Sequence, residues 1–412
     1  MKAEIIAVGT EILLGDIINT NAQYLSKSLA DMGILVYHQS VVGDNSDRLT
    51  EELKASFEKA DIVITTGGLG PTTDDLTKEV GSAYFNKKLV LHQESLDKIE
   101  NFFRTLNRTL TENNKKQAYF PEGSIILAND HGTAPGCIIE DNGKILILLP
   151  GPPKENKPMF ENYVVPYLKK FQQGSLISKT LRICGVGESS VATQISHIIE
   201  KQTNPTVAPY AKENEVTLRI TAKAPNTEEA YKLISPVENE IRDVLGENIY
   251  GKGKTTLENV VAQMLIEKNL SLSTAESCTG GLLSGRLINY PGISKVFMDG
   301  CVTYSNEAKI KRLGVKKETL EIYGAVSKNT AIEMAEGVAI TSGTDIGIST
   351  TGIAGPDGGT DEKPVGLVYI GLYIKGQTYV KKLTSPGDRQ SVRQRTVTSA
   401  LDFLRRNLLK YS

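Results

Sequence analysis

The strongest constraint on the fold is a regular alternation of strand and helix patterns at the start of the chain. Buried-strand patterns occur at Ala3–Val8, Ile34–Val42 and Asp61–Thr66. Helical periodicity covers Asn21–Met32 and Ser46–Lys59 between them. A strand–helix–strand repeat with short connections predicts a parallel sheet with helices on both faces. The N-terminal region is therefore expected to be a doubly wound α/β domain.

The first domain is expected to end near residue 171. A helical region is expected around residues 72–117, and Asn142-Gly143 between two apolar runs predicts a hairpin within 137–149. A helix then ends near Lys170, and the polar run 172–175 predicts a boundary. Residues 1–171 thus form the first predicted domain.

Two further α/β domains are expected. Residues 172–252 show the order βαββαβ, which is typical of a small split-βαβ unit. Residues 253–412 alternate helices and strands, with a glycine-rich loop and a long C-terminal helix. Three α/β domains are therefore predicted for the chain of 412 residues.

The composition excludes several classes of protein. Lys and Arg number 47 and Asp and Glu 48, so the net charge of -1 gives no reason to expect binding to nucleic acid or to a membrane surface. No apolar run approaches a membrane span, and no signal peptide is expected. The four cysteines never form C-x-x-C, which argues against a disulfide framework or a zinc site. A cytoplasmic protein is expected.

Acidic side chains follow three consecutive predicted strands of the first domain. In open α/β sheets, ligands bind beyond the carboxyl ends of the strands, where these side chains are expected to meet. Carboxylates beside a phosphate site are what a hard divalent cation needs. The acidic residues are Glu11 and Asp16, Asp44 and Asp47, and Asp74 and Asp75.

The third of these loops also carries a glycine-rich turn. Gly67, Gly68 and Gly70 allow backbone amides to approach an anion ahead of a predicted helix. For the two aspartates that follow, the alternative is helix capping, with Thr72 and Asp75 in a capping box. The convergence of three acidic loops favours a ligand site.

The third domain lacks histidine, because all four histidines lie before residue 253. Its chemistry must therefore proceed without imidazole. Ser277 and Cys278 lie between a predicted strand and a predicted helix, a placement that exposes a nucleophile at a helix N-terminus. Lys309 offers a base for a serine if desolvation lowers its pKa, and Tyr304 is a candidate to relay or position the proton.

Structural roles are the alternative for each of these residues. Ser277 or Thr279 would cap the helix, Lys309 would be solvated, and Cys278 would be a small buried hydrophobe. The glycine-dense loop 352–359 favours the functional interpretation, because each glycine costs folding entropy and such a loop suits close approach to a phosphate.

The N-terminal motifs resemble a known family. The segments GTEILLGDIINTNAQYL, TTGGLGPTTDD and PGPPKE are similar to the molybdopterin-binding-like domain of the CinA family, which itself resembles MoaB and MogA. The resemblance implies a metal-dependent ADP-ribose pyrophosphatase using Mg, Mn or Co. It implies a metal held by Asp74 and Asp75, with weaker positional assignments for Glu11 and Asp44. Phosphate would lie on the turn that contains Gly67, Gly68, Gly70 and Thr72.

The C-terminal motifs extend the resemblance. AESCTGG, YSNEAK and GIAGPDGG are similar in order and spacing to the CinA C-terminal domain, and VAPYAKENEVTLRITAKA to the connecting domain. The resemblance implies hydrolysis of nicotinamide mononucleotide (NMN), with no cofactor. Ser277 would be the nucleophile, Lys309 the base and Tyr304 their partner. The implied substrate-binding residues are Thr279, Gly352, Gly355, Gly358, Gly359 and Arg393.

These observations predict a homodimeric enzyme that recycles pyridine nucleotides at two hydrolytic sites. The homodimer comes from the resemblance alone. One alternative is a protein that binds a nucleotide or a pterin without turnover, since a fold does not guarantee an activity. The other is an interaction protein of DNA uptake that retains the motifs.

Overall fold

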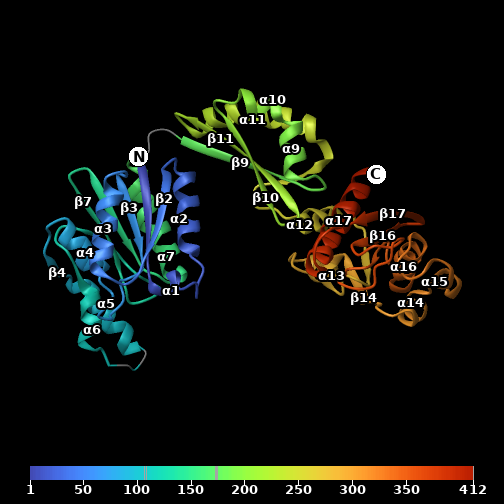
Figure 1. Cartoon of the computed structure of the whole chain (residues 1–412), viewed down its shortest axis with the longest axis horizontal. Coiled ribbons are helices and arrows are strands. Elements are labelled where there is room, and N and C mark those ends of the chain that lie inside the picture. The colour runs from blue at the N-terminus through green and yellow to red at the C-terminus, as the bar shows by residue number, and fades with distance from the viewer. Residues whose placement is uncertain (106, 108, 172–174, 412) are drawn as a thin grey trace. The chain divides into compact units, whose positions relative to one another are not determined.

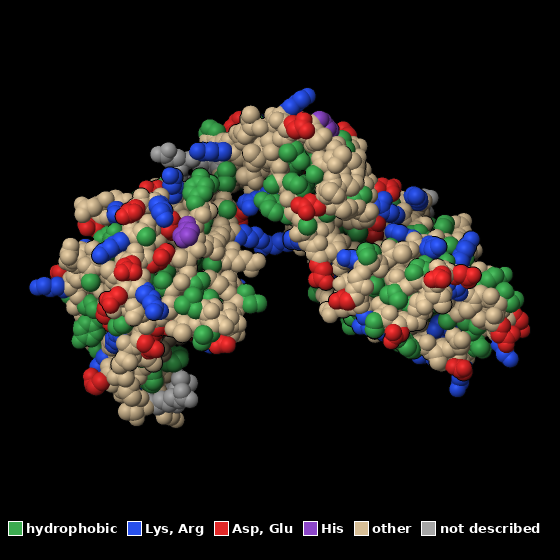
Figure 2. All heavy atoms as spheres, viewed as in Figure 1, with side chains coloured by type: hydrophobic (Ala, Val, Ile, Leu, Met, Phe, Trp, Pro, Cys, Tyr) green, Lys and Arg blue, Asp and Glu red, His purple; other side chains and the backbone are tan. Residues whose placement is uncertain are grey.

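The computed structural model describes residues 1–105, 107, 109–171 and 175–411. Contacts divide them into two units, residues 1–177 with 223–230, and residues 178–222 with 231–412. The predicted boundary at 172–175 falls mostly outside the described residues. Figure 2 shows acidic and basic side chains interspersed on the visible face, in keeping with the near-neutral net charge.

The N-terminal domain is built on a six-stranded sheet with the order β2-β1-β3-β8-β7-β6. The first four strands are parallel, and β7 and β6 run antiparallel to their neighbours. The parallel pairing expected from the repeat is confirmed for β1, β2 and β3, and the predicted Asn142-Gly143 hairpin joins the antiparallel strands β7 and β8. The strands are β1 (Lys2–Val8), β2 (Leu35–Val42), β3 (Ile62–Thr66), β6 (Ile125–Leu127), β7 (Gly136–Asp141) and β8 (Lys144–Leu149).

Helices cover both faces of this sheet, as predicted (Figure 1). Alternate residues of β1 enter separate cores: Ile5 packs with the α2 face and Ile6 with the α3 face. This alternation is the period of two expected for a strand buried on both sides. The helices are α1 (Thr10–Leu13), α2 (Thr20–Asp31), α3 (Ser46–Phe57), α4 (Thr77–Tyr84), α5 (Gln93–Thr105), α6 (Glu112–Lys115), η1 (Lys116–Ala118), α7 (Pro153–Met159), η2 (Phe160–Val164) and α8 (Val165–Lys169).

The region expected to be helical from residue 72 differs in two respects. The helix begins at Thr77, after a turn that contains Asp74 and Asp75. A short strand, β4 (Leu89–Leu91), also interrupts the helical region and pairs with β5 (Tyr119–Pro121).

The middle domain has a four-stranded sheet with the order β10-β11-β9-β12. The predicted βαββαβ order is confirmed, with the first helix divided in two at Ile195. The elements are β9 (Ser175–Ile183), α9 (Glu188–Gln194), α10 (Ser196–Lys201), β10 (Thr206–Lys212), β11 (Glu215–Ala224), α11 (Thr227–Leu245), η3 (Gly246–Asn248) and β12 (Ile249–Lys252).

The C-terminal domain has a five-stranded sheet with the order β14-β13-β15-β16-β17. The first three strands are parallel, and the last two are antiparallel. One face packs against α12, α13 and α17, and α16 covers the other. The elements are α12 (Leu257–Glu267), β13 (Leu272–Glu276), α13 (Leu282–Leu287), η4 (Ile293–Lys295), β14 (Phe297–Val302), α14 (Asn306–Leu313), α15 (Lys317–Tyr323), α16 (Lys328–Ser342), β15 (Ile346–Gly352), β16 (Leu367–Ile374), β17 (Gln377–Thr384) and α17 (Arg389–Lys410).

The fold bears on two features of the sequence, the cysteines and the lack of a long apolar run. Every cysteine is a buried free thiol. In the part of the chain that the structure describes, no helix combines the length and apolar character needed to cross a bilayer.

Candidate functional site

The first candidate site lies where four parallel strands of the N-terminal sheet end. Val8 pairs with Val42, and Thr66 pairs with both Ala7 and Leu149, so the carboxyl ends of β1, β2, β3 and β8 are level. The loops that follow these strands enclose a cavity of about 560 Å³. The cavity is within the range typical of small-molecule sites.

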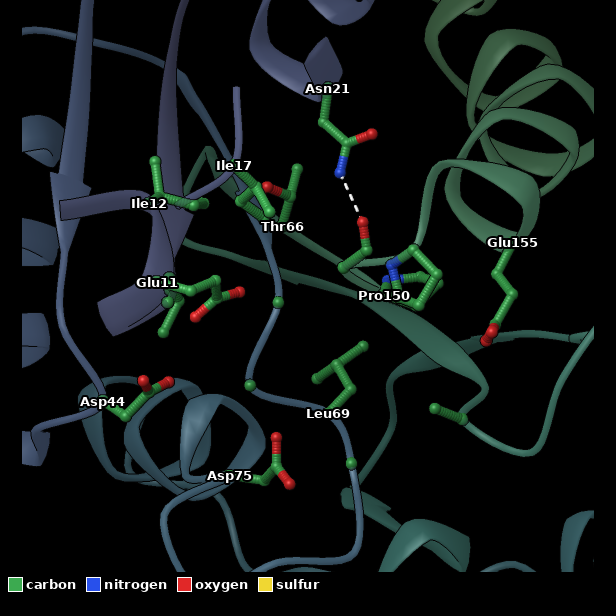
Figure 3. Close-up of a pocket in the computed structure, with 18 of the residues that line it drawn as sticks. Glu11, Ile12, Ile17, Asn21, Asp44, Thr66, Leu69, Asp75, Pro150 and Glu155 are labelled. Atoms are coloured by element: carbon green, nitrogen blue, oxygen red, sulfur yellow. Dashed lines mark hydrogen bonds between the residues drawn. The ribbon is translucent and has the colours of Figure 1, made fainter. Parts of the chain in front are cut away.

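Four predicted carboxylates line this cavity: Glu11, Asp44, Asp74 and Asp75. In Figure 3, Glu11, Asp44 and Asp75 are seen on one side of Leu69, with Glu155 on the other. Asp16 and Asp47, which the sequence placed at the same edge, are not among its lining residues.

The acidic residues make different local contacts. Asp44 Oδ2 accepts hydrogen bonds from the amide and hydroxyl of Thr10, at 2.9 and 2.8 Å. Asp75 Oδ2 accepts from the Thr72 amide at 2.9 Å and from its hydroxyl. Asp74 is exposed, and hydrogen bonding from Thr72 holds its pKa below the ordinary value. Asp74 therefore presents an ionised carboxylate to the cavity.

Capping of a helix by Asp74 and Asp75 is not observed. The helix that follows begins at Thr77, and Glu79 is the acidic residue of its first turn. Asp75 instead bonds back to Thr72, while Lys116 donates to the carbonyl oxygen of Asp75 and forms a 3.1 Å ion pair with Glu79. The two aspartates thus belong to an anchored turn at the cavity.

The glycine turn lines the same cavity. Gly67 has a φ of 105°, and a Cβ there would lie 2.1 Å from the carbonyl oxygen of Val8, so only glycine fits. The Gly67 amide donates a hydrogen bond to the carbonyl oxygen of Leu149. The Thr77 hydroxyl donates to the Gly67 carbonyl oxygen, and the Thr77 amide donates to that of Gly68. Within the described residues, the amides of Gly68, Leu69 and Gly70 have no hydrogen-bond acceptor. Adjacent free amides in a glycine turn form an anion-binding nest.

A complete protein-only metal site is not formed. Among the described residues, no three His, Cys, Asp or Glu side chains are grouped so that they could hold one ion. The four predicted ligands surround the cavity rather than form a cluster. The oxygen donors nevertheless suit a hard cation, because Mg²⁺ is commonly bound by one or two carboxylates together with substrate phosphates and water.

The second candidate site lies at the corresponding edge of the C-terminal sheet. Glu276 of β13 pairs with Val302 of β14 and Thr350 of β15, so these three parallel strands end together. The segments that follow them contain the three sequence motifs, with Ser277 directly after β13 and Lys309 in α14. The pairing of β13 with β14 and β15 therefore brings together segments that are far apart in the sequence.

Lys309 contacts Ser277 directly. Its Nζ lies 3.2 Å from Ser277 Oγ, 2.8 Å from the Thr303 carbonyl oxygen and 3.3 Å from that of Tyr304. The Lys309 side chain is 1% exposed, and this burial lowers its pKa. A solvated helix lysine is therefore excluded. In the described part of the chain no carboxylate pairs with Lys309, and desolvation is the largest influence on its pKa.

Glu276 caps helix α13, a role that the sequence analysis gave to Ser277 or Thr279 as an alternative. Its buried carboxylate accepts from the amides of Gly281, Leu283 and Ser284, at 2.9, 3.1 and 2.8 Å. It also accepts from the Ser284 hydroxyl at 2.6 Å. Because this acid satisfies the helix end, the Ser277 hydroxyl is left to face Lys309.

The surroundings of Cys278, Tyr304 and Thr279 differ from those of Ser277. Burial raises the pKa of the Cys278 thiol to about 12, so Cys278 carries no thiolate near neutral pH. The Tyr304 hydroxyl accepts from Arg389 at 3.0 Å, and it is the Tyr304 carbonyl that contacts Lys309. Thr279 is fully buried, with its hydroxyl 2.6 Å from that of Thr350. The assignments of Tyr304 as the partner of Ser277 and Lys309 and of Thr279 as a substrate-binding residue stay predictions.

Two arginines of α17 contact the segment that follows Ser277 and the glycine loop. Arg393 donates to the carbonyl oxygens of Cys278 and Thr279, at 3.1 and 2.9 Å. Arg389 donates to the carbonyl oxygen of Gly355 at 2.8 Å. The predicted loop glycines are Gly352 at the end of β15, Gly355 and Gly358 with positive φ, and Gly359. Arg393 therefore holds the nucleophile segment in place, a positioning role that the sequence did not reveal.

Comparison with known proteins gives the chain its family. Three family models match successive segments: Probable molybdopterin binding domain over residues 4–170, Damage-inducible protein CinA KH domain over 178–251, and CinA C-terminal domain over 254–408. A protein of Clostridium tetani is 69% identical over 99% of this chain and 100% of its own length. The chain belongs to the CinA family.

Further CinA-family members are similar to the chain. A Clostridium acetobutylicum protein is 64% identical over 99% of this chain and 100% of its own length, and both clostridial proteins are provisionally named competence-damage inducible proteins. A solved structure of a competence/damage inducible protein from Agrobacterium tumefaciens is 40% identical, covers 38% of this chain and 97% of that chain, and has a TM-score of 0.36. The three α/β domains thus match a probable molybdopterin binding domain, a CinA KH domain and a CinA C-terminal domain.

Proposed function

We propose that the C-terminal site hydrolyses the carboxamide of NMN to nicotinic acid mononucleotide and ammonia. The observation that carries this proposal is the 3.2 Å contact between Lys309 Nζ and Ser277 Oγ in a buried setting. A serine needs a neighbouring base to act as a nucleophile, and a desolvated amine can serve.

Lys309 Nζ donates to Ser277 Oγ and to the carbonyl oxygens of Thr303 and Tyr304. Burial lowers the pKa of Lys309, which favours loss of a proton from this amine. The lone pair freed by that loss would accept the Ser277 hydroxyl proton.

The proposed reaction has two steps. Ser277 Oγ attacks the carboxamide carbon while Lys309 takes the hydroxyl proton, and Lys309 then gives that proton to the departing nitrogen, releasing ammonia and leaving an ester on Ser277. Water, activated by the same amine, hydrolyses the ester to the carboxylate. We propose that the loop 352–359 binds the phosphate of the substrate, because its glycines allow close approach of the backbone.

The test is to incubate the purified chain with NMN and to measure both products. Ammonia and nicotinic acid mononucleotide should form in equal amounts without an added metal. If neither forms, the proposal is wrong.

We further propose that the N-terminal site hydrolyses the pyrophosphate of ADP-ribose with a divalent metal, Mg, Mn or Co. The free amides of Gly68, Leu69 and Gly70 support this proposal, because they can hold a phosphate beside Asp74 and Asp75. Asp74 and Asp75 would hold the metal, with Glu11 and Asp44 as further candidates at the same cavity. The bound metal would offset the negative charge of the pyrophosphate.

The corresponding test uses ADP-ribose with each metal in turn. AMP and ribose 5-phosphate should appear with wild type, and Asp74→Ala should be inactive. A wild-type chain that is inactive with every metal would contradict this second activity.

Both activities act on small nucleotides, so together they describe recycling of pyridine-nucleotide breakdown products in the cytoplasm. The homodimer and the absence of a nucleic-acid partner stay predictions.

A further inference from the structure

A cleft of about 520 Å³ lies between the middle domain and the C-terminal domain. One wall is formed by the turn 185–188 and by the tip of the β10–β11 hairpin, residues 211–216. The other wall is formed by β17, α17 and the segment between them. We call it the interdomain cleft. It shares no lining residue with the acidic cavity, and neither Ser277 nor Lys309 lines it.

Direct contacts hold the two walls of the interdomain cleft together. Both walls lie in the second compact unit of the chain. Arg405 of α17 donates to the carbonyl oxygen of Glu247 at 2.6 Å, and Arg406 donates to Asn248 Oδ1 at 2.9 Å. Cys184, directly after β9, packs into the core of the C-terminal domain. These contacts fix one wall relative to the other.

The acids that line the interdomain cleft fall into two groups. Asp402 forms ion pairs of 2.7 and 2.8 Å with two arginines of its own helix, and Glu215 forms one of 2.5 Å with Arg182. None of these arginines lines the cleft. The other two acids, Glu188 and Glu213, are exposed and belong to the wall of the middle domain.

The wall formed by β17 and α17 carries positive charge. Lys381 and Arg395 line the cleft and are half-buried. Among the described residues, neither forms an ion pair with a carboxylate, and Arg395 donates to the carbonyl oxygen of Pro386. Partial burial strengthens the attraction between such cations and an anion, because less water screens the charges.

Two serines of the same wall provide free hydroxyl groups. Ser385 is 3% exposed and Ser399 is half-buried, and both line the cleft. In the part of the chain that the structure describes, neither hydroxyl has a hydrogen-bond partner. A buried hydroxyl group without a partner costs free energy, which a bound ligand would recover.

Two cations beside two free hydroxyl groups suit a phosphate. Lysine and arginine form charge-assisted hydrogen bonds with phosphate oxygens, and serine hydroxyls can donate to the same oxygens. The exposed acids of the opposite wall would repel an anion, so the phosphate belongs against β17 and α17. The cleft is larger than a phosphate requires, and Val186, Val216 and Leu383 line it as well. It therefore has room for an organic group.

We propose that the interdomain cleft binds a small phosphate monoester, with its phosphate at Lys381 and Arg395. The cleft-lining residues of α17, from Ser391 to Asp402, follow helical spacing along one face. Arg389 and Arg393 of the same helix do not line the cleft and contact the segments of the amidase site instead. The inference therefore depends on neither proposed activity.

A fluorescent reporter tests binding in the cleft. The chain contains no tryptophan, so Ala211→Trp places a single reporter at an exposed lining position. Ribose 5-phosphate and AMP should change its emission, and ribose, which lacks the phosphate, should not. Tyr210→Trp is the matched control, because adjacent side chains of a strand point to opposite faces and Tyr210 does not line the cleft. Its emission should stay unchanged.

Replacement of one cation tests the phosphate contact. In the Ala211→Trp background, Lys381→Gln should raise Kd for ribose 5-phosphate at least about tenfold, the scale of one lost charge-assisted hydrogen bond. Lys382→Gln alters the exposed neighbour on β17, which does not line the cleft, and should change Kd by less than about twofold.

Three results would overturn the inference. If Ala211→Trp responds to neither monoester, or if the Tyr210→Trp control responds equally, the cleft is not the binding site. Equal Kd values for the Lys381→Gln and Lys382→Gln variants would exclude the phosphate contact. Inorganic phosphate that binds as tightly as ribose 5-phosphate would indicate a site for the free anion and not for a monoester.

Discussion

The environment of one lysine determines what the C-terminal site can do. Lys309 lies in the first turn of α14, and its side chain reaches back to Ser277 and to two backbone carbonyl oxygens. Burial without a carboxylate partner favours the neutral amine. The C-terminal domain has no histidine to act as a base, and the surroundings of Lys309 are those that a lysine base requires.

The lowered pKa of Lys309 predicts how activity depends on pH. The amine accepts a proton only when it is neutral, so kcat/KM for NMN should rise with pH and level off below the ordinary lysine value of 10.5. Lys309→Arg should be inactive, because a guanidinium group stays protonated. Lys311→Arg, an exposed position on the same helix, should retain full activity. Activity in Lys309→Arg, or a flat pH profile, would exclude Lys309 as the base.

At the residue scale, the sequence identified Ser277 and Lys309 but not their surroundings. The absence of histidine in the C-terminal domain directed attention to the lysine. Glu276 was missed because its hydrogen-bond donors are five to eight positions further along the chain. An acid at the end of a buried strand, followed closely by Gly280-Gly281, was the available signal. Tyr304 was assigned a phenol role, although only its backbone carbonyl contacts Lys309.

At the scale of elements, both sites form where parallel strands end at the same level. Helix α13 begins directly after the Ser277 segment, and Glu276 fixes its first turn. The position of the nucleophile thus depends on this cap.

Replacement of Glu276 tests that dependence. Glu276→Gln places an amide nitrogen against amide and hydroxyl donors, so the C-terminal domain should lose about 2–4 kcal/mol of stability. Its calorimetric transition should move to a lower temperature, and ammonia release should fall although Ser277 is intact. Glu318→Gln, an exposed acid in the first turn of α15, should change stability by less than about 0.5 kcal/mol. Equal transitions for the two variants would exclude a capping role for Glu276.

The regular elements were largely predictable, and the errors have local causes. Apolar periodicity located β1, β2 and β3 and the helices between them. β4 was missed because Leu89–Leu91 is only three residues long, within a region of helical pattern. The helix start near residue 72 was placed too early, because Thr72 and Asp75 resemble a capping box but close a turn instead. Sequence patterns of this length do not distinguish the two.

At the scale of the whole molecule, the two sites use different chemistry in separate sheets. The N-terminal cavity offers carboxylates and a glycine turn, and the C-terminal site offers a serine beside a buried lysine. The order of three α/β domains was predictable from the alternation of elements, and the family models match three corresponding segments.

This separation predicts that the two activities are lost independently. EDTA should stop hydrolysis of ADP-ribose, because carboxylates and phosphates alone repel one another, and it should leave ammonia release from NMN unchanged. Asp74→Ala should lose only the first activity and Ser277→Ala only the second. If either variant lost both activities, the assignment of separate sites would be wrong.

The most direct test of the account compares ammonia release from NMN by Ser277→Ala and Cys278→Ala. The two side chains are adjacent, but only the Ser277 hydroxyl faces Lys309, and the Cys278 thiol has a pKa of about 12. Ser277→Ala should release no ammonia above background, and Cys278→Ala should keep most of the wild-type rate. The reverse pattern, with Ser277→Ala active and Cys278→Ala inactive, would contradict the central claim that a serine–lysine pair performs the chemistry.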